Sequence, residues 1–484
     1  MTELCDLSAV RLRRAIGAGE ISPVELLASC IARIEDCDGT LNAMVARCFD
    51  RARSEAKAAE AAVSAGRPLG VLHGLPVGIK DLQLTGGLRT TFGSPLFADH
   101  VPEADERIVA AVRSAGGIVV GKTNVPEWGA GGNTVNPVHG ATGNPFDPAR
   151  TCGGSSGGSA VALATSMVPL ATGSDTGGSL RTPAAFCGVV GFRPSPGLVP
   201  SERRGLGWTP ISVLGPMGRD VADTGLLLSA IAADDDRDPL AGPVDAPSFA
   251  ALPEVDLAGL KVAVSEDLGF APVSTSIRAT FRERVAIMRG LFARCDEGSP
   301  DMAGADEAFE AIRAANFIAQ HERRHRETPD MLGPNVRANL EQAMAMSLGD
   351  AARAHADQTR IYRDAQRFFR DVDVLVCPAA AVPPFPHRQL FVDEIDGTRL
   401  RTYFHWLGLA YGLTLIGHPV CVIPCGRDSL GLPFGIQICG PRRGDRFTLG
   451  VAAALERALA ADTRTARPLP VVRGASSPAV PAAP

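Results

Sequence analysis

The sequence predicts a layered α/β protein built around a parallel or mixed β-sheet. Short apolar segments bounded by glycine, such as residues 77–79 and 118–120, are typical of buried strands. Helical patterns alternate with them, for example over residues 107–115 and 156–165. The chain has 484 residues, of which 45% are hydrophobic and 21% charged, so it is large enough for one α/β enzyme or several average domains.

The N-terminal elements follow from capping and periodicity. Ser22 and Glu25 form a predicted capping box with Pro23 at the first helical position, so a helix should run to about Glu35. An alanine-rich helix is expected over residues 41–64, and from Gly70 the pattern changes to short strands. The strands expected next are residues 77–79, 118–120, 168–171 and 189–192, with helices over 107–115 and 156–165 between them.

Long helices dominate the second half of the chain. Residues 233–250, rich in Asp, Pro and Ala, should form a surface loop. The small residues and prolines of the tail, from about Ala475, predict disorder. The remaining expected elements are strands over 260–264, 374–377 and 420–423 and helices over 274–295, 305–326, 348–371, 401–413 and 446–460.

Charge and cysteine content exclude several classes of protein. The net charge of −5 gives no electrostatic signature for nucleic acid or anionic lipid. The N-terminus shows no signal-peptide pattern, and no apolar run approaches the ~20 residues of a membrane span. The 11 cysteines are scattered without a C-x-x-C pair, so thiols such as Cys421 and Cys425 should be free and buried. A soluble cytoplasmic protein is expected.

A Walker A spelling occurs at residues 116–123, but its context is wrong. A phosphate-binding loop has a strand before the glycine loop and a helix after the lysine. Here the predicted strand lies inside the motif, and Pro126 follows the lysine closely. Phosphate binding is not expected.

His321 and His325 match the H-E-x-x-H zinc motif on a predicted helix. This spacing would place both rings on one helix face, with Glu322 as the base of a zinc metallopeptidase. The segment is strongly charged, however, and no third ligand follows at a familiar spacing. A solvated helical turn is the simpler interpretation, and no metal site is predicted.

Residues 153–157 match G-x-S-x-G, which would make Ser155 the nucleophile of a Ser-His-Asp esterase. Such an elbow directly follows a strand. The preceding segment, residues 144–150, is turn-like instead, and the downstream His405 and His418 have no distinctive context. The esterase remains a weaker alternative.

Lys80, Ser155 and Ser179 form a different candidate site. Each lies in a glycine-rich context without a histidine, and a buried lysine can act as the base for a serine nucleophile when its neutral form is favoured. The simpler alternative is that Lys80 pairs with Asp81 at a strand end and the serines lie on flexible loops. The residues alone leave this choice open.

At this point the sequence resembles the amidase signature family. The matching segments cover about residues 70–220 in detail, and looser similarity extends towards both ends, as in GLPFGIQ at 431–437. One departure is Cys152, where many relatives carry proline. The matching segments are GLPVGIKD at 74–81, GKTN at 121–124, GGSSGGSA at 153–160 and GSDTGGSLRTPAAFCG at 173–188.

The resemblance implies a fold and a reaction. The expected fold is a large central mixed β-sheet flanked by helices on both faces, within a single domain over residues 1–474 that has a more variable helical region at about 233–372. The expected enzyme is an amidase that forms a serine acyl-enzyme and needs neither a metal nor an organic cofactor.

The resemblance also assigns roles to residues. Ser179 would be the nucleophile, Ser155 a proton relay that follows a cis peptide bond, and Lys80 the base. The oxyanion hole would be formed by the backbone N–H groups of Thr176, Gly177, Gly178 and Ser179.

Substrate choice is less clearly encoded. Residues Trp128, Gly129, Ala130 and Gly131 are expected in the acyl pocket, and the aromatic residues Tyr403, Phe404, Trp406 and Tyr411 either line its other side or lie in the core. Apolar walls would suit an aryl or alkyl small-molecule amide. The alternative within the family is the glutamine-hydrolysing subunit of a tRNA-dependent amidotransferase, which requires a partner subunit. Family members are often homodimers, but nothing in this chain indicates its oligomeric state.

Overall fold

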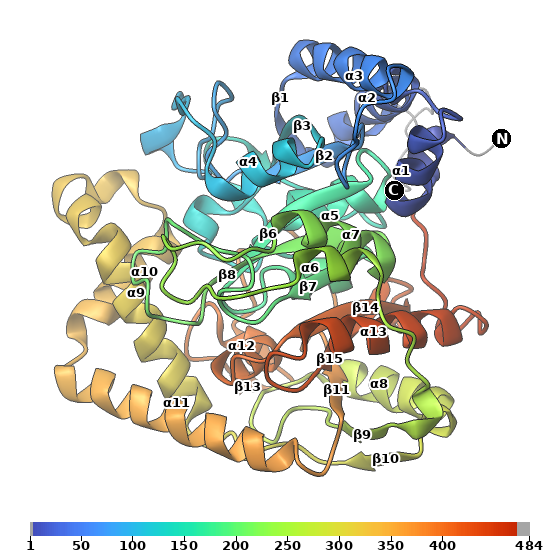
Figure 1. The fold of residues 1–484 in the computed structure, drawn as a ribbon. Helices are drawn as coiled ribbons and strands as arrows, with labels where there is room; N and C mark the ends of the chain where they lie inside the picture. Colours follow the sequence, from blue (N-terminus) through green and yellow to red (C-terminus); the bar gives the residue numbers. More distant parts are fainter. Residues whose placement is uncertain (1–2, 472–484) are drawn as a thin grey trace, which may run out of the picture.

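The protein is built on an 11-stranded mixed β-sheet, which confirms the predicted fold class. The computed structural model describes residues 3–471, so the expected disordered tail lies outside the described residues. Figure 1 shows the sheet running from β1 at the top to β10 at the bottom. In spatial order its strands are β1 (Met44–Arg47), β3 (Ile118–Thr123), β2 (Pro76–Lys80), β6 (Leu170–Asp175), β8 (Val213–Gly218), β7 (Val190–Arg193), β14 (Val420–Arg427), β15 (Pro433–Cys439), β11 (Val374–Pro378), β9 (Lys261–Val264) and β10 (Arg294–Glu297).

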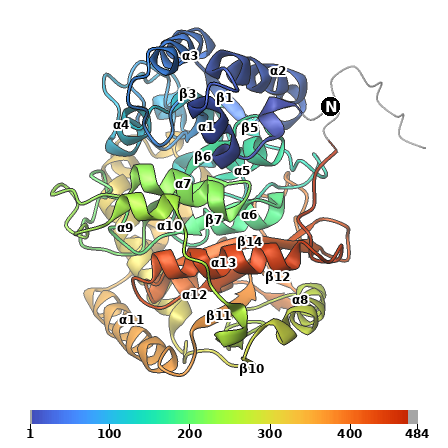
Figure 2. The same ribbon diagram turned by 45° about the vertical axis from the view of Figure 1, so that its right-hand side comes forward.

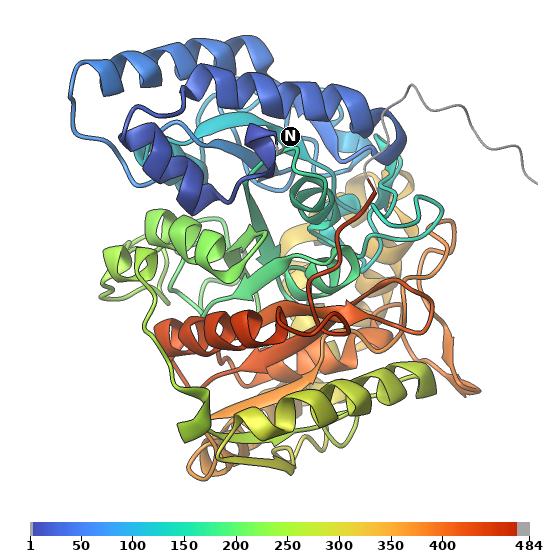
Figure 3. The same cartoon turned by 90° about the vertical axis from the view of Figure 1, so that its right-hand side faces the viewer.

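Helices cover both sides of this sheet. The helices α9, α10 and α11 form a group at the left of Figure 1, whereas α7, α13 and α8 face the viewer in Figures 2 and 3. The bounds of the helices are α1 (Ala9–Gly17), α2 (Pro23–Leu41), α3 (Phe49–Ser64), α4 (Arg107–Ser114), α5 (Gly157–Ala164), α6 (Arg181–Cys187), α7 (Val221–Ile231), α8 (Thr275–Met288), α9 (Ala305–Glu327), α10 (Pro334–Ala345), α11 (Leu348–Phe368), α12 (Gly408–Leu415) and α13 (Asp445–Leu459).

Parallel pairing brings the functional segments to one edge of the sheet. Strand β2 pairs in parallel with β3 and with β6. Lys80 is the last residue of β2 and Asp175 the last of β6, so both strands end at the same edge. The loops that follow them therefore start close together.

Two predicted helices are wrong at one end because an edge strand replaces a helical turn. The helix expected over residues 41–64 is instead preceded by β1, since α2 ends at Leu41 and Asn42 adopts a left-handed conformation with φ 53°. The Asp38 carboxylate accepts the N–H groups of Ala43 and Met44 and so fixes this turn. The helix expected over 274–295 ends at Met288, and β10 follows it and pairs with β9.

The boundaries of the other predicted helices and strands differ less from those in the structure. The predicted capping box of α2 is only half formed, because Ser22 Oγ accepts the N–H groups of Val24 and Glu25 but the Ser22 N–H is not donated to the Glu25 carboxylate. The helix expected over 401–413 is α12, which begins at Gly408, and the strand expected over 168–171 is β6, which begins at Leu170. The strands β8 and β15 and the helices α1, α6, α7 and α10 were not predicted.

The core contains the thiols that the sequence placed there. All cysteines are free, and all except Cys48 are buried. Burial raises the pKa of the Cys425 thiol to about 12, which keeps it protonated. Within residues 3–471, no helix combines the length and apolar character needed to cross a membrane.

Glycine at position 158 is required by close backbone packing at the start of α5. A Cβ atom there would lie 2.2 Å from the Asn124 nitrogen and 2.7 Å from the Ala43 oxygen. We expect Gly158→Ala to lower the stability by ~3 kcal/mol or more, because backbone atoms cannot move aside cheaply. The shift in the urea unfolding midpoint measures this.

Gly39, exposed in α2, is the matched control. A Cβ atom at Gly39 would meet nothing within 4 Å, so Gly39→Ala should stabilise the protein by about 0.5–1 kcal/mol through helix propensity. Equal destabilisation by both substitutions would contradict the packing argument.

Candidate active site

Lys80 lies at the end of β2, fully buried and surrounded by hydroxyl groups. Its Nζ atom lies 2.8 Å from Ser155 Oγ, 2.8 Å from Ser156 Oγ and 2.9 Å from Ser174 Oγ. A carbonyl oxygen, that of Ser174, lies 3.4 Å away. All these partners are uncharged, so the lysine has no direct counter-ion in the part of the chain that the structure describes. The simpler interpretation, a pair between Lys80 and Asp81, is wrong, because Asp81 bonds Thr91 instead.

Burial lowers the pKa of Lys80 to about 7, although the charge of Asp175 opposes this effect. At neutral pH a large share of Lys80 is therefore in its amine form, which can accept a proton. An exposed lysine with a pKa near 10.4 would be almost entirely protonated.

Ser155 is held in a tightly packed segment before α5. The peptide bond between Gly154 and Ser155 is cis, as the resemblance implies. The next residue, Ser156, donates its N–H to the Ser179 carbonyl oxygen at 3.1 Å. This bond joins the Ser155 segment to the Ser179 segment, and Lys80 contacts the first of them directly.

The loop that carries Ser179 is organised by Asp175. Its carboxylate accepts the N–H of Gly178 at 2.9 Å and that of Leu180 at 3.1 Å. Gly178 has φ 119°, a left-handed conformation that favours glycine, and a Cβ atom there would lie 2.7 Å from the Ala410 side chain. The loop therefore turns sharply between β6 and α6.

Two buried arginines hold this carboxylate in its charged form. Arg181 donates to Asp175 through Nε and Nη2, each at 2.9 Å, and Arg193 donates through Nη1 at 3.1 Å. Burial alone would raise the pKa of Asp175, but Arg181 and Arg193 outweigh it and hold the pKa well below its usual range.

One of the four expected oxyanion donors is already occupied. The Gly178 N–H is donated to Asp175, so its inclusion in the oxyanion hole needs correction. The N–H groups of Thr176, Gly177 and Ser179 have no acceptor in the described part of the chain. These three remain available to a substrate oxygen.

Ser155 and Ser179 line a small cavity of about 70 Å³. Trp128, Gly129 and Gly131 line it as expected, but Ala130 does not. Ala130 instead packs against Leu332, Val336 and Leu340, because the loop turns its side chain towards α10.

The far wall of the cavity comes from the helical region. Tyr403 and Phe404 line it, whereas Trp406 and Tyr411 are buried in the core. Phe309 and Arg313 of α9 also line it and were missed by the sequence analysis. Their i, i+4 spacing on the expected helix 305–326 was the available signal, since it places them on one face.

A second cavity of about 230 Å³ continues from the first. Both are lined by Leu82, Trp128, Gly129, Ser174, Thr176 and Arg313, so together they form one corridor to Ser155 and Ser179. Arg203, Arg204 and Gln320 line the outer part.

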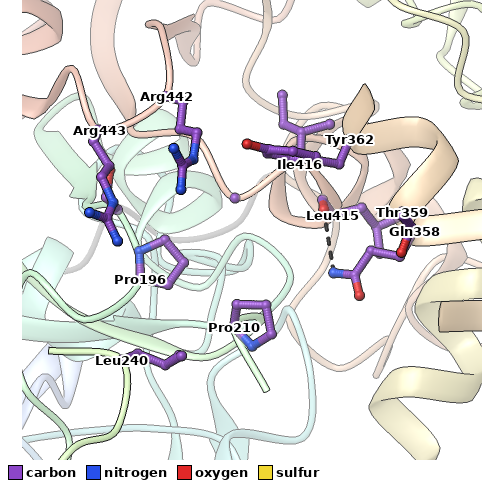
Figure 4. A pocket seen from close by; sticks show the side chains of 12 residues that line it. Pro196, Pro210, Leu240, Gln358, Thr359, Tyr362, Leu415, Ile416, Arg442 and Arg443 are labelled. Carbon is purple, nitrogen blue, oxygen red and sulfur yellow. Dashed lines mark hydrogen bonds between the residues drawn. The ribbon is translucent and has the colours of Figure 1, made fainter. Parts of the chain in front are cut away.

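Another hollow, of about 320 Å³, is separate from this corridor. Figure 4 shows Arg442 and Arg443 on one side of it and Tyr362 with Gln358 on the other. Neither Lys80 nor a candidate nucleophile lines it.

The structure provides little support for the zinc or esterase alternatives. His321 is buried against the Trp128 ring, with ring centroids 5.0 Å apart, and residues 3–471 contain no group of three or more side chains suited to a metal. His405 bonds Asp306, and His418 bonds the Gly440 carbonyl oxygen. Each of the two candidate histidines is therefore hydrogen-bonded to a group other than Ser155.

The Walker A spelling is likewise part of the sheet rather than a phosphate loop. Its lysine, Lys122, lies in β3 and is buried. Lys122 Nζ donates to Thr85 Oγ1 at 2.8 Å and to the Gln83 carbonyl oxygen.

Comparisons with known proteins show which family and which structures this chain is similar to. The profile of the family described as Amidase matches residues 25–449. An acylamidase from Rhodococcus erythropolis is 34% identical, and the match covers 93% of this chain and 95% of that protein. A glutamyl-tRNA(Gln) amidotransferase subunit from Chloroflexus aurantiacus is also 34% identical, with 94% and 97% covered. The crystal structure of a bacterial aryl acylamidase matches with a TM-score of 0.87 at 27% identity, covering 93% and 96%.

The ion cluster around Asp175 generates a stability prediction. Asp175→Asn should cost about 3–5 kcal/mol, because it leaves the buried Arg181 and Arg193 without a counter-ion. The urea unfolding midpoint measures the loss. The control Asp296→Asn breaks an exposed pair with Arg294 and should cost less than about 1 kcal/mol. Similar effects of the two substitutions would contradict the role of the cluster.

Proposed function

The chain belongs to the amidase family and acts on amide C–N bonds, and we propose that it hydrolyses small aryl or alkyl amides through an acyl-enzyme on Ser179. The observation that carries this proposal is the buried Lys80, which contacts Ser155 at 2.8 Å and has no direct counter-ion. A neutral amine in that position supplies the base that a serine nucleophile needs.

The first step is attack of Ser179 Oγ on the amide carbon. Ser179 gives its proton to Ser155, and Ser155 gives its own proton to Lys80. The product is a tetrahedral oxyanion and a protonated lysine. The free N–H groups of Thr176, Gly177 and Ser179 stabilise the oxyanion, each typically by ~3 kcal/mol in the transition state.

The second step breaks the C–N bond. Ser155 donates its proton to the leaving nitrogen and regains one from Lys80. Ammonia or an amine then departs, and Ser179 carries the acyl group. Water attacks this ester by the same proton path in reverse and releases a carboxylate.

Part of the cavity wall supports an aryl or alkyl substrate. Leu82, Trp128, Phe309, Phe404 and Leu407 provide apolar surface, beside polar groups such as Arg313 and the serines. The apolar part of the wall favours an apolar group next to the scissile amide.

A second candidate is a glutamine-hydrolysing amidotransferase subunit. It is favoured by the 34% identity to the Chloroflexus aurantiacus amidotransferase subunit, which equals the identity to the acylamidase. Ammonia release from glutamine by the isolated chain, compared with release of para-nitroaniline from acyl para-nitroanilides, distinguishes the two. Activity on anilides without a partner protein supports the stand-alone amidase.

Acyl-enzyme formation tests the catalytic roles. Intact mass spectrometry with acyl anilides should detect an adduct on the wild-type chain, and Ser179→Ala should abolish it. Lys80→Met should slow acylation by roughly 10³-fold or more, because no base remains for the serines. The control Lys57→Met, on the exposed side of α3, should react like the wild type. An adduct that survives Ser179→Ala but disappears in Ser155→Ala would instead favour Ser155 as the nucleophile.

The pH profile tests the state of Lys80. Its pKa is about 7, and only the neutral form accepts a proton, so kcat/KM should rise about tenfold per pH unit below that value and level off above it. Rates measured from about pH 5 to 9 provide the profile. A midpoint near 10, the usual lysine value, or a rate that falls with pH would sink the assignment of Lys80 as base.

A further inference from the structure

We propose that Arg313 binds a carboxylate on the substrate, so that the preferred amides carry an anionic group in addition to the scissile bond. This inference rests on the proposed function, because it concerns the same cavity. It identifies the class of substrate more narrowly, as aryl or alkyl amides with an acidic substituent.

Arg313 is placed to contact a substrate. It lies on α9 one turn after Phe309, and both side chains line the cavity that contains Ser155 and Ser179. It also lines the outer cavity, so it stands where the corridor meets the nucleophile. Only 8% of the residue is exposed.

Arg313 is a buried cation without a counter-ion among residues 3–471. No carboxylate in residues 3–471 lies within 4.0 Å of its guanidinium nitrogens. The other arginines beside the nucleophile loop, Arg181 and Arg193, share Asp175. Buried charges are normally paired, so the missing partner of Arg313 indicates that a ligand supplies it.

The hydrogen bonds of Arg313 leave donors free. Its Nε atom donates to Asn339 Oδ1 at 3.3 Å, and Nη2 donates to the Tyr403 hydroxyl. Its Nη1 atom makes no hydrogen bond within the described residues. A guanidinium group has five N–H donors in a planar fork, so enough remain for a bidentate bond to a carboxylate.

Aromatic rings hold the guanidinium in place before a ligand arrives. Its Cζ atom lies 4.5 Å from the Phe317 ring centroid, 5.0 Å from that of Phe404 and 5.7 Å from that of Tyr403. Such contacts stabilise a cation but do not neutralise it. They fix its orientation, which reduces the entropy lost on binding.

The corridor itself favours an anion. Arg203 and Arg204 line its outer part, and Arg204 retains buried Nε and Nη2 atoms without partners although it pairs with Asp238. The acidic residue among the lining side chains is Glu106, and burial raises its pKa to about 7. Positive charge therefore outweighs negative charge along the path, which concentrates anionic ligands.

The test measures binding rather than turnover. In Ser179→Ala protein, calorimetry gives the Kd of two matched pairs of amides. The first pair is the mono-para-nitroanilide of glutaric acid and its isostere with isopropyl in place of the carboxylate. The second is the butyryl amide of para-aminobenzoate and that of para-toluidine. The pairs place the charge on the acyl side and on the amine side respectively.

We expect the anionic member of at least one pair to bind roughly 10- to 100-fold more tightly, as for hydrogen bonds between charged groups. Arg313→Met should remove this preference while leaving the neutral ligand within about threefold, because methionine retains contact with the aromatic rings. Arg313→Lys should restore part of the preference, since it keeps the charge but loses the planar fork. The control Arg323→Met, exposed on the same helix and paired with Glu327, should leave every Kd unchanged.

Two outcomes would overturn the inference. One is equal binding of the anionic and neutral members in both pairs. The other is an Arg313→Met protein that weakens both members alike, as a purely structural arginine would. A wild-type chain that prefers the anionic ligands but forms no acyl-enzyme would contradict the proposed function and leave the anion recognition standing.

Discussion

The site depends on the pairing of Asp175 with Arg181 and Arg193. A single free carboxylate close to Lys80 would hold a proton on the lysine and remove the base. Arg181 and Arg193 both donate to Asp175 and offset its charge, so its effect on the pKa of Lys80 is smaller than that of burial. Lys80 is then surrounded by serine hydroxyls and a carbonyl oxygen, and burial makes its neutral form accessible. The proposed chemistry therefore depends on an ion cluster that itself exchanges no proton with the substrate or with Lys80.

The same cluster ties distant parts of the chain to the nucleophile loop. Arg181 also donates to the Ala410 carbonyl oxygen, to Thr414 Oγ1 and to Gln437 Oε1. These partners belong to α12 and β15, far from Arg181 in the sequence. The carboxylate of Asp175 meanwhile accepts two backbone N–H groups of the loop. Asp175 thus holds the loop directly, and Arg181 connects it to the C-terminal half of the protein.

The sequence was sufficient for the parts of the site that lie within short segments. Lys80, Ser155 and Ser179 each stand in a dense glycine pattern, and the structure brings Lys80 against Ser155 and places both serines in one cavity. Local sequence patterns could not predict which strands pair with each other or which charged side chains lack a counter-ion. The edge strands β1 and β10 are four residues each and form only because β3 and β9 offer free edges. Arg313 was missed for the same reason, since its significance arises from a carboxylate that residues 3–471 do not provide once folded.

The cavity is assembled from two separate stretches of sequence. The proposed base, relay and nucleophile come from residues 80–179, whereas much of the opposite wall comes from residues 309–407. Substitutions in the second stretch can exchange the substrate while the first is inherited intact, so this architecture is highly evolvable. Similarity to relatives therefore indicates the type of reaction better than it indicates the substrate. This division is consistent with the equal identity of the chain to an acylamidase and to an amidotransferase subunit.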